Sequence, residues 1–73
     1  MTAAQKRVYR FVAEFIRENG YAPTRREIAD GLRYASPNAA ECHLQALKKL
    51  GAIHLAPGGA RKLSLNPQYL GFV

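Results

Sequence analysis

The spacing of apolar residues predicts that the chain begins with a helix of several turns. Between about residues 3 and 19, apolar side chains recur at the i, i+3, i+4 spacing of one helical face. This stripe consists of Val8, Phe11, Val12, Phe15 and Ile16. Thr2 with Gln5 has the pattern of a capping box, and Gly20 stands where a helix C-cap glycine belongs. On the opposite side lie Lys6, Arg10 and Arg17, either as a solvated face or as phosphate contacts.

A short second helix is predicted after an extended connector. Pro23 disfavours helical backbone at the residue before it, and Thr24 with Glu27 repeats the capping-box pattern. We expect this helix over about residues 25–32. Its inward side chains would be Ile28, Ala29 and Leu32.

A third helix is predicted to begin after Ser36, a natural N-cap, with Pro37 in the first helical position, and to end at Gly51. Its inward stripe would be Ala40, Leu44, Leu47 and Leu50, with His43 at the edge. The outward side carries Asn38, Glu41, Cys42, Gln45 and Lys49, with Ala39 and Ala46 near its margin. Such a polar side is ordinarily a solvated face, so its meaning depends on the rest of the chain.

After Gly51 the apolar period changes to two, which predicts a β-hairpin. The alternating segments are residues 52–56 and 61–65, and the sequence Pro57-Gly58-Gly59-Ala60 between them suits a turn. We therefore expect one domain over residues 1–66 and an apolar tail over residues 67–73. The tail would either cover the first helix or form a homodimer contact through Tyr69, Leu70, Phe72 and Val73.

Three helices followed by a hairpin is the element order of a winged helix-turn-helix, a mostly α fold with a two-stranded C-terminal β-hairpin wing. In that architecture the third helix lies in the major groove of DNA. The charge of the chain agrees with this, because 11 Lys and Arg against 5 Asp and Glu give a net charge of +6 and a pI near 10. Such an excess on 73 residues favours a polyanionic partner.

Hydrogen-bonding side chains stand where base reading would need them, at the start of the third helix. An amide such as Asn38 can pair with adenine, a carboxylate such as Glu41 can accept from cytosine, and Ala39 can meet a thymine methyl. The candidate base-reading residues are Ser36, Asn38, Ala39, Glu41, Cys42 and Gln45. Candidates for the DNA backbone are Thr24, Arg25, Arg26, Lys48, Lys49, Arg61 and Lys62.

Other classes of protein are disfavoured. A single cysteine, Cys42, allows no intramolecular disulfide or cysteine-rich zinc site and fits a reducing cytosol. Cys42 and His43 would point about 100° apart on a helix, which argues against a shared metal or a Cys–His catalytic pair. No apolar run reaches the ~20 residues of a membrane span. We expect no cofactor, no enzymatic activity, no small-molecule substrate and no membrane partner.

Nearly the whole chain resembles the DNA-binding domain of the LexA repressor family. The resemblance lies in residues 23–29 (PTRREIA), 36–41 (SPNAAE), 43–47 (HLQAL) and 51–53 (GAI). It implies a transcriptional regulator of a bacterium or its phage, most simply a repressor, that reads a CTGT-type half-site. Base contacts would come from Ser36, Asn38, Ala39 and Glu41, and a backbone contact from the wing sequence Gly58-Gly59-Ala60-Arg61.

Two positions depart from that family's pattern. Cys42 stands where family members often have a second carboxylate, and Arg33 stands where a glycine is usual, which would strain the turn by roughly 1 kcal/mol if positive φ is required. The sequence also lacks the self-cleaving peptidase segment of the family, so we expect no self-cleavage. An alternative function is a protein-interaction module that docks on a repressor, a polymerase or a replication protein.

Overall fold

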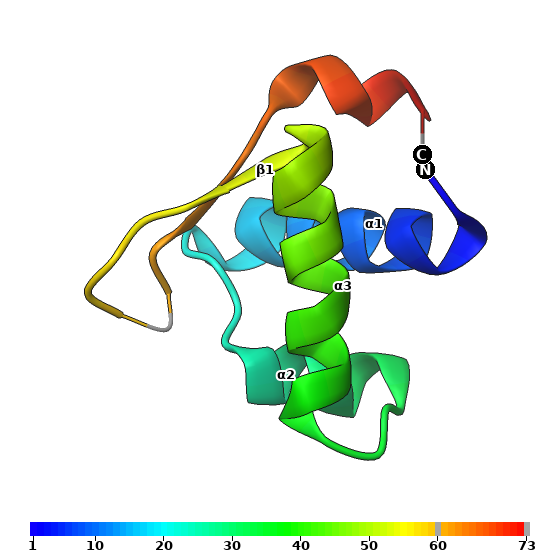
Figure 1. The fold of residues 1–73 in the computed structure, drawn as a ribbon. Helices are drawn as coiled ribbons and strands as arrows, with labels where there is room; N and C mark the ends of the chain where they lie inside the picture. The colour runs from blue at the N-terminus through cyan, green and yellow to red at the C-terminus, as the bar shows by residue number, and fades with distance from the viewer. Residues whose placement is uncertain (60, 73) are drawn as a thin grey trace.

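The computed structural model describes residues 1–59 and 61–72, so Ala60 and Val73 lie outside the described residues, as does the side chain of Phe72. The elements are α1 (Ala3–Asn19), α2 (Arg25–Leu32), α3 (Pro37–Leu50), β1 (Ile53–Leu55), β2 (Leu63–Leu65) and the 3-10 helix η1 (Pro67–Phe72). α3 crosses α1, α2 lies at the N-terminal end of α3, and the hairpin extends to one side (Figure 1). The predicted mostly α fold with a two-stranded hairpin is confirmed.

The helix boundaries follow from local capping. In both predicted capping boxes the threonine hydroxyl accepts from the N3 amide at 3.1 Å and the N3 side chain accepts from the threonine amide at 2.8 Å. Gly20 and Gly51 end α1 and α3 with φ of 81° and 83°, values that glycine adopts without a Cβ penalty. Ser36 differs from expectation: it is the N-cap residue of α3, but its hydroxyl makes no capping hydrogen bond.

The core lies where the three helices and the hairpin meet. It contains Val8, Tyr9 and Val12 of α1, Ile28 and Ala29 of α2, Ala40, Leu44 and Leu47 of α3, and Ile53 and Leu63 of the hairpin. Phe11, Phe15 and Ile16 of the predicted α1 stripe are only half-buried. The packed face of α1 is therefore rotated toward Tyr9, which the apolar spacing did not single out.

Tyr9 is fully buried, yet its hydroxyl is satisfied. The hydroxyl donates to the carbonyl of Asn66 at 2.7 Å, and burial raises the pKa of Tyr9 above its ordinary value. A ring with a polar tip can be buried when that tip reaches a partner. This bond joins α1 to the segment that leaves the hairpin.

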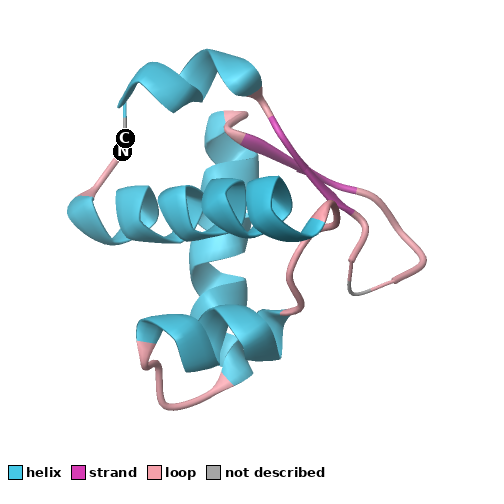
Figure 2. Cartoon of the chain, turned by 180° about the vertical axis from the view of Figure 1, so that it is seen from behind, coloured by secondary structure: helices cyan, strands magenta, loops and turns pink. Residues whose placement is uncertain are grey.

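The prediction that Leu50 faces the core is wrong, because 45% of it is exposed. Leu50 is the last residue of α3, and the helix there extends beyond the region that α1 covers (Figure 2). The buried side chain after the helix end is Ala52, which the chain reversal at Gly51 turns into the core.

The hairpin is antiparallel, with Ile53 opposite Leu65, His54 opposite Ser64 and Leu55 opposite Leu63. Its strands are shorter than the predicted alternating segments, although an Ala56 amide to Lys62 carbonyl bond of 2.9 Å continues the pairing. Gly58 has a φ of 103°, as expected for a glycine in this turn. We call residues 53–65 the wing.

The tail is folded against the domain. The ring of Tyr69 packs on the core and its hydroxyl donates to the carbonyl of Leu50 at 2.9 Å, whereas 49% of Leu70 is exposed. Tyr69 thus contacts the body of the domain at the end of α3. Both alternatives for the tail, covering the first helix and forming a homodimer contact, stay predictions.

Candidate nucleic-acid interface

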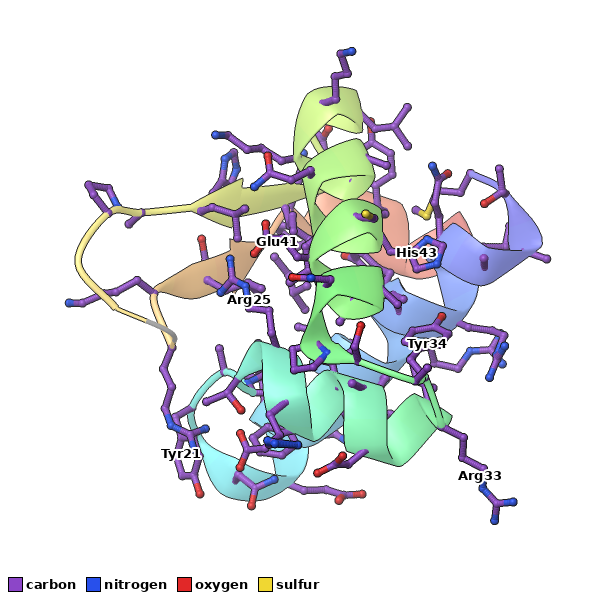
Figure 3. All side chains as sticks on the ribbon, turned by 60° about the horizontal axis from the view of Figure 1, so that its bottom comes forward. Tyr21, Arg25, Arg33, Tyr34, Glu41 and His43 are labelled. Atoms are coloured by element: carbon purple, nitrogen blue, oxygen red, sulfur yellow. The ribbon has the colours of Figure 1, made fainter. Side chains whose placement is uncertain are left out.

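The polar side of α3 is open to solvent. We call Asn38, Glu41, Cys42, Gln45 and Lys49 the outer face of α3. Every member is exposed except Glu41, which is half-buried, as is Ala39 at the margin. No described segment of the chain covers this face, so another molecule can reach it (Figure 3).

Glu41 is held in place by residues of two helices. Its Oε1 accepts from Arg25 Nε at 2.8 Å and its Oε2 accepts from Gln45 Nε2 at 2.6 Å. The hydrogen bond from Gln45, and then that from Arg25, hold the pKa of Glu41 below its ordinary value. The carboxylate is therefore ionised at neutral pH, and each oxygen keeps a lone pair for a further donor.

This arrangement joins residues that the sequence analysis assigned separately. Arg25, a candidate for the DNA backbone, lies beside Glu41, a candidate for base reading (Figure 3). Gln45, another candidate for base reading, bonds to the same carboxylate. The Arg25–Glu41 ion pair links the N-terminal turn of α2 to the first half of α3. It thereby fixes the carboxylate relative to the helix axis before any ligand arrives.

We call the candidate contacts for the DNA backbone on the helices and the wing the rim. Arg26, Lys48 and Lys49 are exposed on the helices, and Gly58, Gly59 and Lys62 are exposed on the wing. Thr24 is half-buried, and its hydroxyl is engaged in the α2 capping box. The exposed members of the rim present positive charge and backbone amides to solvent.

Arg61 is placed differently from the other wing residues. Its Nη1 donates to the carbonyl of Ala22 at 2.9 Å and to Oε1 of Glu27 at 2.8 Å, and its Nη2 donates to Oε2 of Glu27 at 3.2 Å. The guanidinium carbon lies 4.6 Å from the ring centroid of Tyr21. Neither Glu27 nor Tyr21 could be recognised from the sequence as a partner of Arg61, since both lie far from it along the chain.

The turn between α2 and α3 has an unusual backbone conformation. Arg33 adopts φ 61° and ψ 39°, and among the described residues it is the non-glycine residue with positive φ. The condition under which strain was expected at this position, a positive φ, is therefore met. Beside it, the rings of Tyr34 and His43 lie 5.4 Å apart, and the buried hydroxyl of Tyr34 has no hydrogen-bond partner among the described residues.

Two helices joined by a short turn, the second with an open polar face, and a hairpin beside them define a winged helix-turn-helix protein. The family model described as the LexA DNA binding domain matches residues 1–62. The chain belongs to this family of DNA-binding domains, which favours DNA over a protein as the partner.

Three similar proteins are LexA repressors of bacteria. The chain is 48% identical over 65 residues to that of Hahella chejuensis, 45% over 65 residues to that of Pseudomonas chlororaphis and 41% over 68 residues to that of Ralstonia nicotianae. These alignments cover 89%, 89% and 93% of this chain, respectively, and 32% of each relative. The chain thus spans about a third of the length of the curated relatives that it matches.

Two searches of the described residues bear on the other classes of function. No three His, Cys, Asp or Glu side chains gather there as metal ligands would. Within the same residues, every helix is too short or too polar to cross a bilayer.

Proposed function

We propose that this protein binds double-stranded DNA in a sequence-specific manner and acts as a transcriptional repressor. The single observation that carries the proposal is the open outer face of α3, in which a fixed carboxylate stands among exposed amide and thiol side chains. A helix of this kind fits the major groove, where each base pair presents its own pattern of donors and acceptors. The cations of the rim suit the phosphates on either side.

Each part of the outer face has a distinct task in this proposal. Asn38 pairs with an adenine and Ala39 meets a thymine methyl, while Ser36, whose hydroxyl makes no cap bond, is available to a base or a phosphate. Glu41 accepts from a cytosine amino group. Because it is held by Arg25 and Gln45, it selects against bases that present an acceptor at the same place.

Affinity common to all sequences comes from the rim. Arg26, Lys48, Lys49 and Lys62 contact phosphates in this proposal, and the loop at Gly58 and Gly59 lets the backbone approach. Their contribution depends on salt, because neutralising a phosphate releases condensed cations. The net charge of +6 supports a large electrostatic share of the binding free energy.

Two copies are proposed to occupy a palindromic operator in the bacterial cytoplasm, with no enzymatic activity of this domain. Leu50 and Leu70 support a dimer contact, since they are 45% and 49% exposed and lie near the Tyr69–Leu50 hydrogen bond. A second copy bound nearby multiplies affinity through effective concentration.

Selection of bound sites from random duplex DNA tests the proposal, followed by salt titrations on the selected site and on an unrelated duplex. Asn38→Ala should cost ~1–3 kcal/mol on the selected site and relax its base preference. Lys49→Ala is the matched control, which should weaken both duplexes equally and reduce the salt slope by ~0.9. A selected consensus that is palindromic would support two copies.

The proposal is wrong if no sequence is enriched, or if Asn38→Ala leaves the base preference intact. Binding of a protein partner that does not weaken with salt would instead favour the protein-interaction alternative.

A further inference from the structure

We propose that Arg61 is a positioning residue that fastens the wing to the α1–α2 connector and the start of α2, instead of a phosphate contact. This inference rests on the proposed function, because its consequence is the orientation of the wing toward DNA. We call Arg61, Glu27, Tyr21 and the carbonyl of Ala22 the wing clasp.

The guanidinium of Arg61 has several partners at once. Arg61 makes two hydrogen bonds to the Glu27 carboxylate, a third to the Ala22 carbonyl, and lies over the ring of Tyr21. The hydrogen bond between the Arg61 and Glu27 side chains is the main reason that the pKa of Arg61 is raised and that the pKa of Glu27 is lowered. A planar guanidinium suits this combination of a forked carboxylate contact and an aromatic face. Lys62, the neighbouring cation, forms no ion pair with any of the described residues.

The clasp lies in the part of the wing that the backbone holds least firmly. Each strand has three residues, and the turn between them contains two adjacent glycines, so the backbone alone holds the far end of the hairpin weakly. Arg61 lies at the beginning of the returning segment, and its partners lie 34 and 39 residues away in the chain. Figure 3 shows Tyr21 beneath the end of the wing, on the side of α2. The clasp thus ties the outer part of the hairpin to the helix pair that carries the outer face of α3.

Glu27 has an orientation that does not depend on Arg61. Its Oε1 accepts from the Thr24 amide at 2.8 Å in the capping box, so the carboxylate that Arg61 meets is held by the first turn of α2. The N-terminus of a helix favours a carboxylate. Wing and helix pair are therefore joined through an anchored residue, and the wing is oriented before DNA arrives, which reduces the ordering required on binding.

The effect of Glu27→Gln on DNA affinity distinguishes a clasp from a phosphate contact at Arg61, because the two interpretations predict changes in opposite directions. If Arg61 contacted phosphate, removal of a nearby negative charge would raise DNA affinity. If Arg61 positions the wing, Glu27→Gln breaks the ion pair and affinity falls. Glutamine should keep the helix cap, because Gln5 caps α1 in the same way.

The experiment measures Kd on one duplex over a range of salt concentrations for the wild type, Arg61→Gln, Glu27→Gln, the double variant and two controls. Both single variants should bind roughly threefold to thirtyfold more weakly with an unchanged salt slope, as expected from lost preorganisation. Lys62→Gln, the phosphate-contact control, should lower the slope by ~0.9. Glu14→Gln, the control for an exposed carboxylate on α1, should not weaken binding.

In the Arg61→Gln background, Glu27→Gln should no longer weaken binding, since the two residues act together. The inference is overturned if Glu27→Gln binds as tightly as the wild type or more tightly, or if Arg61→Gln lowers the salt slope as Lys62→Gln does.

A second measurement on the free protein keeps this inference separate from the proposed function. Amide hydrogen exchange should be at least tenfold faster at Ala56 and Lys62, whose N–H groups bond within the wing, in Arg61→Gln and Glu27→Gln, and unchanged in Glu14→Gln. If the wild type bound no DNA, the proposed function would fail, and unaltered exchange in both clasp variants would independently refute the clasp.

Discussion

Replacement of Arg33 by glycine should stabilise the fold. Arg33 has a left-handed backbone conformation, φ 61° and ψ 39°, which costs a residue with a Cβ about 1–2 kcal/mol. Glycine avoids this cost but gives back about 0.4–1 kcal/mol through the greater freedom of the unfolded chain. The Arg33 side chain is exposed and points away from the domain (Figure 3), so its loss removes no packing. The net expectation is a gain of roughly 0.5–1 kcal/mol.

Thermal and urea unfolding followed by circular dichroism measure this gain. For a domain of this size it corresponds to an increase in Tm of about 2–8 °C. Arg33→Ala is the matched control, because it removes the same charge and keeps the Cβ, and it should be no more stable than the wild type. The helix-ending hydrogen bonds of residue 33 use its backbone amide, so all variants retain them.

Gly20→Ala provides the reverse test. Gly20 has φ 81°, and a Cβ added there would meet no atom within 4 Å, so any loss of stability comes from backbone conformation alone. The Gly20→Ala variant should lose about 1 kcal/mol of unfolding free energy.

Equal stability of Arg33→Gly and Arg33→Ala would refute the reasoning, since the two variants differ in the Cβ atom that causes the strain.

Two further predictions concern single polar groups. Tyr34→Phe should raise the free energy of unfolding by about 1 kcal/mol in urea titrations. The substitution removes a buried hydroxyl that has no partner among the described residues and keeps the ring beside His43. A loss of stability would mean that the hydroxyl is satisfied. Glu41 has a lowered pKa in the fold, so its stabilisation is present above the ordinary value of 4.5 and is lost as the pH falls through the lower folded value. In acid titrations, wild-type stability should therefore fall more steeply below pH 4.5 than that of Glu41→Gln, and parallel curves would contradict this interpretation.

The helices and their limits could be predicted from the sequence because the signals that fix them are local. Thr2 and Thr24 each bond to a residue three positions away, so a short stretch of sequence contains the whole capping interaction. Gly20 and Gly51 end helices through their own backbone freedom. The outer face of α3 was also predictable, since helical period alone decides which side chains share a side.

Tertiary structure decided what lies against those faces. The spacing of apolar residues does not determine how a helix is rotated against its neighbours, or where its end extends beyond the body of the domain. For this reason Tyr9 and not Phe11 is fully buried, and Leu50 is exposed.

The same holds for the charged residues of the interface. Composition shows many cations, and only the packing of segments distant in the chain shows which of them have a carboxylate within reach. Arg25 meets Glu41 and Arg61 meets Glu27 because α3 and the wing fold back onto α2. The sequence by itself therefore determined the elements and their polar faces, whereas the fold determined which charges remain for DNA, because ion pairs depend on distances in space and not on spacing along the chain.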